Sequence, residues 1–183
     1  MTRVVSPLEG LLDGGQNMVL IGLGSNRGDS GPIVDEACSY LAHYAQADFR
    51  CSSLWRTNPI DCPPGSGDFI NAAVAFEPRR IYSPERLLRE LKTLEAVAGR
   101  LPNTRRNEPR LLDLDLLLFG QQRRQSATLR LPHPRAAQRR FVLAPAAEIV
   151  PNMRWPGLGL SVAQLLSQLT DSDQAIRLSD SGG

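Results

Sequence analysis

The stretch that most constrains the fold is PRLLDLDLLLFG, from Pro109 to Gly120. Its apolar run predicts a buried β-strand, yet Asp113 and Asp115 stand inside it. Burying an ionised carboxylate without a partner is costly, so the two aspartates need a reason to be there. Because successive strand residues point to opposite faces, the aspartates share one face. The same alternation predicts Leu112, Leu114 and Leu116 on the other face, and Leu111, Leu117 and Phe119 on the aspartate face.

Two carboxylates on one strand face form a pair of hard oxygen ligands. Such a pair suits one or two Mg²⁺ ions bound to a polyphosphate. The alternative is that the aspartate face is simply solvated, as one face of many antiparallel sheets is. The apolar residues predicted on the aspartate face argue against that alternative.

The order of apolar patterns along the chain predicts the fold class. A strand over 18–24 is followed by a helix over 33–44, which Asp29 or Ser30 would cap, and by strands over 49–57 and 69–76. A helix from Ser83 to Gly99 and the aspartate strand complete a β-α-β-β-α-β series. This series is typical of the ferredoxin-like arrangement, an α+β fold with an antiparallel sheet and the helices packed on it. Two C-terminal helical additions are expected over 141–150 and 161–168.

The length of 183 residues suits one domain. We expect residues 1–17 to be a loose extension, 18–178 to be the domain, and 179–183 to be a tail. No apolar run approaches the ~20 residues of a membrane span, and no signal peptide is recognisable. The three cysteines are odd in number and lack CxxC spacing, which indicates a reduced, cytoplasmic setting.

Positive charge gathers in the second half of the chain, although the net charge is only +2. Ten arginines between positions 100 and 140 indicate an anion site, and phosphate matches the guanidinium fork. A solvated basic face or an RNA-binding patch is the alternative. Because aromatic residues make up only 5% of the chain, there is little material for stacking nucleic-acid bases.

Three smaller features also bear on function. The stretch Gly22–Gly28 fits neither the GxGxxG motif of dinucleotide-binding folds nor the GxxxxGK[ST] motif of the P-loop. A tight strand-to-helix turn is therefore the better interpretation. His133, between two prolines, either donates to a phosphate or is an ordinary loop residue, and the spacing leaves both open. In FINAAVAF, alternation puts the ring of Phe69 and the amide of Asn71 on one face.

The motifs IGLGSN, TNPI, FINAAV, PRLLDLDLLLFG and LPHPRAAQRRFVLAPAAEI, in this order, resemble 6-hydroxymethyl-7,8-dihydropterin pyrophosphokinases of the folate pathway. The resemblance runs from about Met18 to the C-terminal helix. It implies a transfer of pyrophosphate from ATP to 6-hydroxymethyl-7,8-dihydropterin, with AMP as the other product. ATP is then the co-substrate and two Mg²⁺ ions are the cofactors.

The resemblance also assigns residues. Asp113 and Asp115 would hold the metals, and the catalytic residues would be Arg100, Arg110, His133 and Arg139. The pterin would be bound by Thr57, Pro59, Ile60, Phe69, Asn71, Asp113 and Phe141. ATP would be bound by Lys92, Glu95, Arg106, Arg110, Leu116, Arg130, His133 and Arg139.

The sequence departs from the family pattern at a few positions. Asn107 and Glu108 stand where many members have Trp-Gly, and Lys92 stands where glutamine is common. No metal ligand or core arginine is missing, so we expect an active monomeric enzyme without nucleic-acid or membrane partners. The alternatives are a non-catalytic pterin- or ATP-binding paralogue and an RNA-binding ferredoxin-like module.

Overall fold

The computed structural model of the chain describes residues 17–58, 67–99, 110–170 and 175–178. Of the predicted extension over 1–17 only Asn17 is included, and the predicted tail over 179–183 lies outside the described residues. The elements, in chain order, are β1 (Val19–Ser25), α2 (Ser30–Leu41), β2 (Ala45–Cys51), β3 (Trp55–Thr57), β4 (Phe69–Pro78), α3 (Pro84–Val97), β5 (Asp113–Phe119), β6 (Arg124–Gln125), β7 (Arg130–Leu131), α4 (Arg140–Ile149), α5 (Val162–Gln168) and β8 (Ala175–Arg177).

The main sheet is antiparallel throughout. β1 lies between β4 and β5, and the strand order is β5-β1-β4-β3-β8, with β2 also paired to β4. β2 and β3 pair with opposite ends of the same edge of β4, so they act as one interrupted strand. The sequence analysis predicted this part as a single strand over 49–57. The prediction of an α+β fold with an antiparallel sheet is confirmed.

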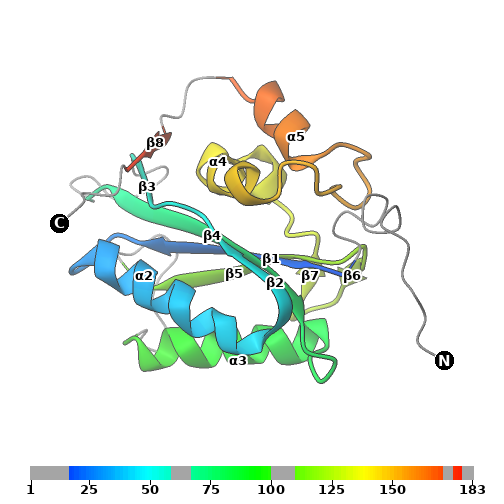
Figure 1. The fold of residues 1–183 in the computed structure, drawn as a ribbon, viewed down its shortest axis with the longest axis horizontal. Coiled ribbons are helices and arrows are strands. Elements are labelled where there is room, and N and C mark those ends of the chain that lie inside the picture. Colours follow the sequence, from blue (N-terminus) through cyan, green and yellow to red (C-terminus); the bar gives the residue numbers. More distant parts are fainter. Residues whose placement is uncertain (1–16, 59–66, 100–109, 171–174, 179–183) are drawn as a thin grey trace.

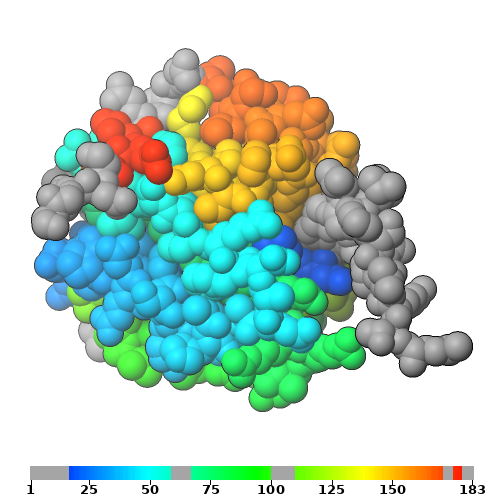
Figure 2. All heavy atoms as spheres, viewed as in Figure 1, coloured from blue at the N-terminus to red at the C-terminus, as the bar shows by residue number. Residues whose placement is uncertain are grey.

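Helices cover both faces of the sheet (Figure 1). The predicted helices α2 and α3 lie on one face, and the C-terminal helices α4 and α5 lie on the other. Figure 2 shows the yellow and orange atoms of α4 and α5 packed directly against the cyan atoms around β2 and β3. The second helical layer completes the burial of the central strands, which explains why β1 and β4 are apolar on both faces.

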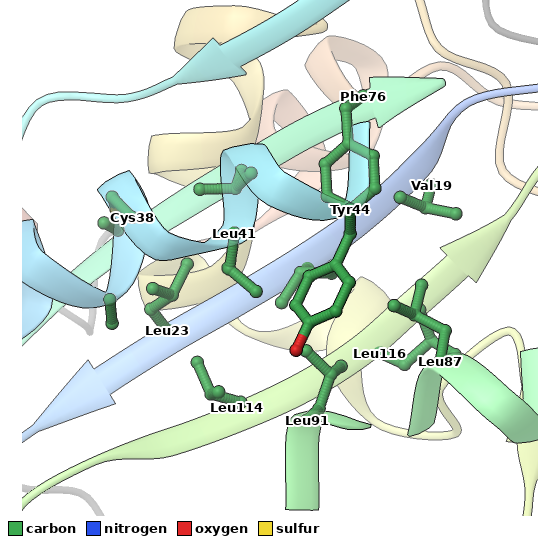
Figure 3. Packing of buried hydrophobic residues seen from close by; sticks show 14 of the residues in the cluster. Val19, Leu23, Cys38, Leu41, Tyr44, Phe76, Leu87, Leu91, Leu114 and Leu116 are labelled. Atoms are coloured by element: carbon green, nitrogen blue, oxygen red, sulfur yellow. The ribbon is translucent and has the colours of Figure 1, made fainter. Parts of the chain in front are cut away.

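The larger core lies between the sheet and the pair α2 and α3. Alternate residues of the central strands point into it, and Figure 3 shows them meeting leucines from both helices. The labelled members include Val19, Leu23, Leu41, Phe76, Leu87, Leu91, Leu114 and Leu116. The remaining strand residues, such as Leu20, Ala73 and Ala75, pack against α4 and α5 on the opposite face.

A register shift in β5 corrects one prediction from the sequence. Leu20 pairs with Leu118 but Ile21 pairs with Leu116, so Leu117 is an extra residue of the kind found in a β-bulge. Leu117 and Leu118 therefore both pack toward α4 and α5, and Phe119 points into the core beneath α2 and α3. Phe119 was predicted on the aspartate face. The prediction was wrong because strict alternation does not continue through the bulge.

The helix α3 begins and ends as its sequence predicts. The Ser83 side chain accepts a hydrogen bond from the Arg86 backbone N–H at 3.2 Å, and Pro84 occupies the first turn. Gly99 ends the helix with a φ of +98°, in the left-handed region that favours glycine. No helix in the described ranges is long and apolar enough to cross a membrane.

The C-terminal strand β8 is held in place by a hydrogen-bonded carboxylate. Glu148 of α4 accepts hydrogen bonds from Ser53 Oγ at 2.7 Å and from the Trp55 indole at 3.0 Å, and it pairs with Arg177 of β8 at 3.0 Å. Burial alone would raise the pKa of Glu148, but these donors and the Arg177 charge lower it. The sequence analysis predicted neither β8 nor this network.

We expect Glu148→Ala to lower the free energy of unfolding by roughly 1.5–3 kcal/mol, the usual range for hydrogen bonds to a charged group. Because folding lowers the pKa of Glu148, its stabilisation is present above the ordinary value of 4.5 and is lost as the pH falls through the folded value. Urea unfolding at pH 7 and at pH 3.5 measures both effects. Glu85→Ala, which removes an exposed partner of Arg124, should cost less than about 1 kcal/mol. Equal losses in the two variants would contradict the expectation.

Candidate active site

Two glycines of β1 form a floor without side chains on the face of the sheet that α4 covers. Gly24 pairs with Asp113 on one side and with Asn71 on the other, and Gly22 pairs with Asp115 and Ala73. Residues directly opposite each other in antiparallel strands point to the same face. Neighbouring strands are about 4.8 Å apart, so the carboxylates and the Asn71 amide stand on either side of a glycine strip about 10 Å wide.

The carboxylate side of this floor carries surplus negative charge. Burial raises the pKa of Asp115, and the nearby Asp113 carboxylate raises it further, against the opposing charges of His133, Lys92 and Arg110. Asp113 accepts a hydrogen bond from Arg110 Nη1 at 2.8 Å. A site in which ionisation is this unfavourable is suited to a bound cation.

Two carboxylates alone do not complete a metal site. No group of three or more His, Cys, Asp or Glu side chains suited to a metal occurs among the residues that the structure describes. Mg²⁺ commonly takes one or two carboxylates and completes its octahedron with water and substrate phosphate oxygens. The donor set of Asp113 and Asp115 therefore fits Mg²⁺ on a polyphosphate better than a cage made of protein ligands.

Arg110 is fixed by Asn26, a residue that the sequence analysis quoted but gave no role. The Arg110 N–H donates to Asn26 Oδ1 at 2.8 Å, and the Asn26 N–H donates to the Arg110 carbonyl at 3.1 Å. Asn26 Nδ2 and Arg110 Nε are buried and have no hydrogen-bond partner among the residues that the structure describes. Unpaired buried donors are costly, and two of them beside a carboxylate pair suit the oxygens of an anionic ligand. The only signal in the sequence was an asparagine in the turn after β1.

The other side of the floor carries the Asn71 amide and the Phe69 ring, which the alternation in FINAAVAF predicted on one face. Asn71 and Thr57 are both buried, and Asn71 Nδ2 donates to Thr57 Oγ1 at 2.7 Å. A Cβ built on Gly24 would lie 3.1 Å from Asn71 Oδ1 and 4.0 Å from Phe69 Cδ1. Both side chains therefore reach over the same glycine, as alternation predicted.

The loop before α4 and the first turn of α4 bring His133, Arg139 and the Phe141 ring to the same face. The backbone N–H of His133 donates to the Leu117 carbonyl at 2.9 Å, and this bond ties the loop to β5 near Asp115. Burial lowers the pKa of His133, Arg139 and Arg135 lower it further, and Asp115 opposes the shift. The Arg139 guanidinium lies 5.3 Å from the centre of the Phe141 ring, within the range of a cation–π contact.

Other predicted site residues lie elsewhere. Lys92 and Glu95 of α3 contact each other and the backbone of Leu114. The Leu116 side chain is in the core beneath α2 and α3, so any contact with a ligand would have to use its backbone. Arg130 is exposed on β7.

Several predicted residues fall outside the described ranges. They are Arg100 and Arg106 from the arginine-rich loop, Pro59 and Ile60 from the loop after β3, and the Asn107-Glu108 pair.

Comparison with known proteins gives the same identification from independent data. The family described as 7,8-dihydro-6-hydroxymethylpterin-pyrophosphokinase (HPPK) matches residues 20–151. A 2-amino-4-hydroxy-6-hydroxymethyldihydropteridine pyrophosphokinase of Synechocystis is 37% identical over 154 residues, which is 82% of this chain and 75% of the relative. The enzyme of the same name from Bacillus subtilis is 37% identical over 134 residues, covering 73% of this chain and 78% of the relative.

The fold also matches a solved structure. A crystal structure of wild-type Plasmodium falciparum HPPK-DHPS with pteroate superposes with a TM-score of 0.62 at 12% identity. The match covers 82% of this chain and spans less than half, 44%, of the longer Plasmodium chain. The structural match supports the fold, and the sequence matches decide the family: the chain belongs to the 7,8-dihydro-6-hydroxymethylpterin-pyrophosphokinase family.

Proposed function

We propose that this chain transfers the pyrophosphoryl group of ATP to the hydroxymethyl group of 6-hydroxymethyl-7,8-dihydropterin, with two Mg²⁺ ions, in folate synthesis. The family membership supports the reaction class. One observation of the site carries the assignment furthest. A half-buried carboxylate pair, in which burial and mutual repulsion raise the pKa of Asp115, lies beside buried N–H donors that have no partner among the described residues. A magnesium-bound polyphosphate suits both groups at once.

The chemistry requires little covalent work from the protein. The hydroxyl oxygen of the pterin attacks the β-phosphorus of ATP, the bond from that phosphorus to the oxygen of the α-phosphate breaks, and AMP leaves. Catalysis of such transfers consists mainly of positioning and neutralising charge. Bound at Asp113 and Asp115, Mg²⁺ would supply positive charge to the phosphates and to the attacking oxygen.

The residues of this chain would bind and orient the two substrates. Arg110 would direct its remaining N–H groups at phosphate oxygens while it stays bonded to Asp113. His133 and Arg139 approach the same phosphates from the loop before α4. Since burial lowers the pKa of His133, the imidazole would be neutral near pH 7 and would act as a hydrogen-bond donor.

The pterin would lie over the glycine floor. Phe69 and Phe141 would stack on the flat ring, and Asn71, held by Thr57, would bond its polar edge. Pro59, Ile60, Arg100 and Arg106 keep the roles that the sequence resemblance gives them. Lys92, Glu95, Leu116 and Arg130 were assigned to ATP in the same way, and for the first two a different role is argued below.

The proposal is tested by following both products in one reaction. With ATP, Mg²⁺ and the dihydropterin, phosphorus NMR should show AMP and a pterin pyrophosphate forming at equal rates. Formation of ADP instead of AMP would mean that a single phosphoryl group is transferred. Calorimetric binding of both ligands without turnover would identify a non-catalytic relative and overturn the proposal.

From the sequence we also propose that the enzyme is a cytoplasmic monomer. Cys38 and Cys51 are free thiols, as expected in a reducing compartment. Light scattering on the purified chain tests the oligomeric state, and cell fractionation tests the compartment.

We expect Gly24→Ala to weaken pterin binding because its methyl group would lie 3.1 Å from Asn71 Oδ1, on the floor where the ring would rest. Overpacking of this kind costs about 1–3 kcal/mol, which corresponds to roughly 5- to 150-fold in the dissociation constant. Fluorescence titration with the pterin measures the change. Gly31→Ala on α2 is the matched control, because its methyl group would meet Leu54 Cδ1 at an ordinary 3.8 Å, away from the floor. Unchanged affinity in Gly24→Ala would place the pterin elsewhere.

A further inference from the structure

The strand that carries both aspartates has a backbone edge at Leu114 that no strand in the described parts of the chain covers. β1 pairs with one side of β5. On the other side, the N–H and C=O of Leu114 bond to side chains of α3 instead of another strand. A strand edge of this kind is free to fray or to rotate its peptide groups unless something satisfies it.

Two charged side chains of α3 satisfy that edge together. Glu95 Oε1 accepts a hydrogen bond from the Leu114 N–H at 2.7 Å, and Lys92 Nζ donates to the Leu114 carbonyl at 3.0 Å. Lys92 Nζ also donates to Glu95 Oε1 at 2.7 Å, which closes a ring of three bonds. The pair thus offers Leu114 one acceptor and one donor, as a neighbouring strand would.

The position of Leu114 gives this contact its importance. Its N–H belongs to the peptide group that joins it to Asp113, and its C=O belongs to the peptide group that joins it to Asp115. The two bonds therefore fix both peptide planes between the carboxylate-bearing residues. Rotation of either plane would turn one carboxylate relative to the other.

The burial of Glu95 argues against an incidental contact. The residue is 1% exposed, and burial raises the pKa of its carboxyl group against the opposing charge of Lys92. Apolar residues of similar size often stabilise a core as well as a buried ion pair does, or better. A charge kept at this cost in the core therefore indicates a positioning role.

We propose that Lys92 and Glu95 form a strand-edge clamp that holds Asp113 and Asp115 in the geometry required for binding divalent cations. The clamp deepens the proposed function, since it acts on the metal ligands assigned there. Lys92 and Glu95 are positioning residues in this proposal. Lys92 Nζ and Glu95 Oε1 bond to the backbone of Leu114, on the edge of β5, and in this proposal they act on the substrates through the two aspartates.

The first test uses the protein without substrates. Glu95→Leu removes the acceptor, and Glu95→Gln keeps an oxygen that can accept from the Leu114 N–H. We expect Glu95→Leu to speed hydrogen exchange of the Leu114 amide at least about tenfold and to weaken binding of Mn²⁺ alone, followed by electron paramagnetic resonance, by a similar factor. Glu95→Gln should retain most of the amide protection and of the Mn²⁺ affinity.

The second test removes the donor, whose own side chain is exposed, and thermal unfolding of each variant verifies that the chain still folds without the partner of Glu95. Lys92→Met should raise the Mg²⁺ concentration for half-maximal AMP formation about tenfold, while the KM for ATP changes less than about threefold. Lys92→Gln, which keeps an N–H donor, should recover most of this loss. Arg89→Met removes another exposed cation of α3 and is the matched control for lost charge.

The outcomes separate the clamp from the proposed function. If the wild-type chain forms no AMP but Glu95→Leu still weakens Mn²⁺ binding and exposes the Leu114 amide, the clamp stands and the reaction is wrong. If AMP forms but both variants keep the wild-type Mn²⁺ affinity and Mg²⁺ dependence, the clamp is wrong. A rise in the KM for ATP at an unchanged Mg²⁺ requirement would show direct nucleotide contact and would also overturn it.

Discussion

Asp115→Asn is expected to abolish AMP formation and at the same time to make the metal-free protein more stable. Loss of a ligand that neutralises developing charge removes several kcal/mol of transition-state stabilisation, or roughly a thousandfold or more in rate. In the absence of metal, however, the half-buried Asp115 carboxylate repels Asp113 and is incompletely solvated. Removing its charge should therefore raise the melting temperature of the metal-free protein.

The pH dependence of stability checks the second half of this expectation. In the unfolded chain Asp115 titrates near 3.8, and folding raises its pKa, mainly through burial. The folded protein then binds this proton more tightly than the unfolded chain does. The contribution of Asp115 to the free energy of unfolding thus falls as the pH rises from about 3.8 through the folded value, and it stays unfavourable above that value. The difference between wild type and Asp115→Asn, measured by thermal unfolding with a chelator present, should follow this course.

Added Mg²⁺ and an ATP analogue should reverse the ranking, because ligands that bind only the folded state stabilise it. Wild type should gain stability and Asp115→Asn should gain little. If the variant keeps turnover within tenfold of wild type, the assignment of Asp115 as a metal ligand is wrong. Asp35→Asn, a substitution on α2, serves as the control and should change neither rate nor metal response.

The second large effect is expected at Arg110. Its guanidinium pairs with Asp113, and its backbone is held from both sides by Asn26. Arg110→Ala should lower kcat about a thousandfold, at the lower end of the effect of an arginine that stabilises a transferring phosphoryl group. Rapid-quench measurement of AMP formation would give the rate of the chemical step.

Arg110→Lys separates the charge of this residue from its shape. A lysine supplies a point charge without the planar fork, so we expect it to recover only part of the loss. Asn26→Ala should show a smaller decrease of the same kind, since it would leave Arg110 in place but unanchored. A KM effect with an unchanged kcat in Arg110→Ala would contradict a role in the transition state.

The apolar periodicity of the sequence was sufficient to predict helices α2 and α3 and the strands of the sheet apart from β8, although it joined β2 and β3 into one strand. Alternation in FINAAVAF was enough to place Phe69 and Asn71 over one face, and Ser83 and Gly99 marked the ends of α3. These features are local, because a strand face or a helix end depends on residues only a few positions away. Alternation gave the wrong face for Phe119, beyond the bulge at Leu117, since a bulge depends on how the partner strand pairs with it.

The relations that the sequence did not predict all join distant parts of the chain. The contact of Asn26 with Arg110 spans 84 positions, and that of Trp55 with Glu148 spans 93. Glu95 was assigned to ATP from the resemblance, and neither its burial nor its contact with Leu114 on β5 was predicted. Such pairings follow from the packed fold, and no pattern within one segment specifies them.

The glycine floor has a consequence for inhibitor design and for resistance. A compound that rests on Gly24 contacts main-chain atoms, which a point mutation cannot remove. Every replacement of Gly24 adds bulk toward Asn71 Oδ1, where even a Cβ would lie at 3.1 Å. If the pterin lies over this strip as proposed, a change that excluded the drug would also exclude the natural ring. Resistance would have to arise instead at the surrounding side chains, which makes the backbone strip the part of the pocket on which to build.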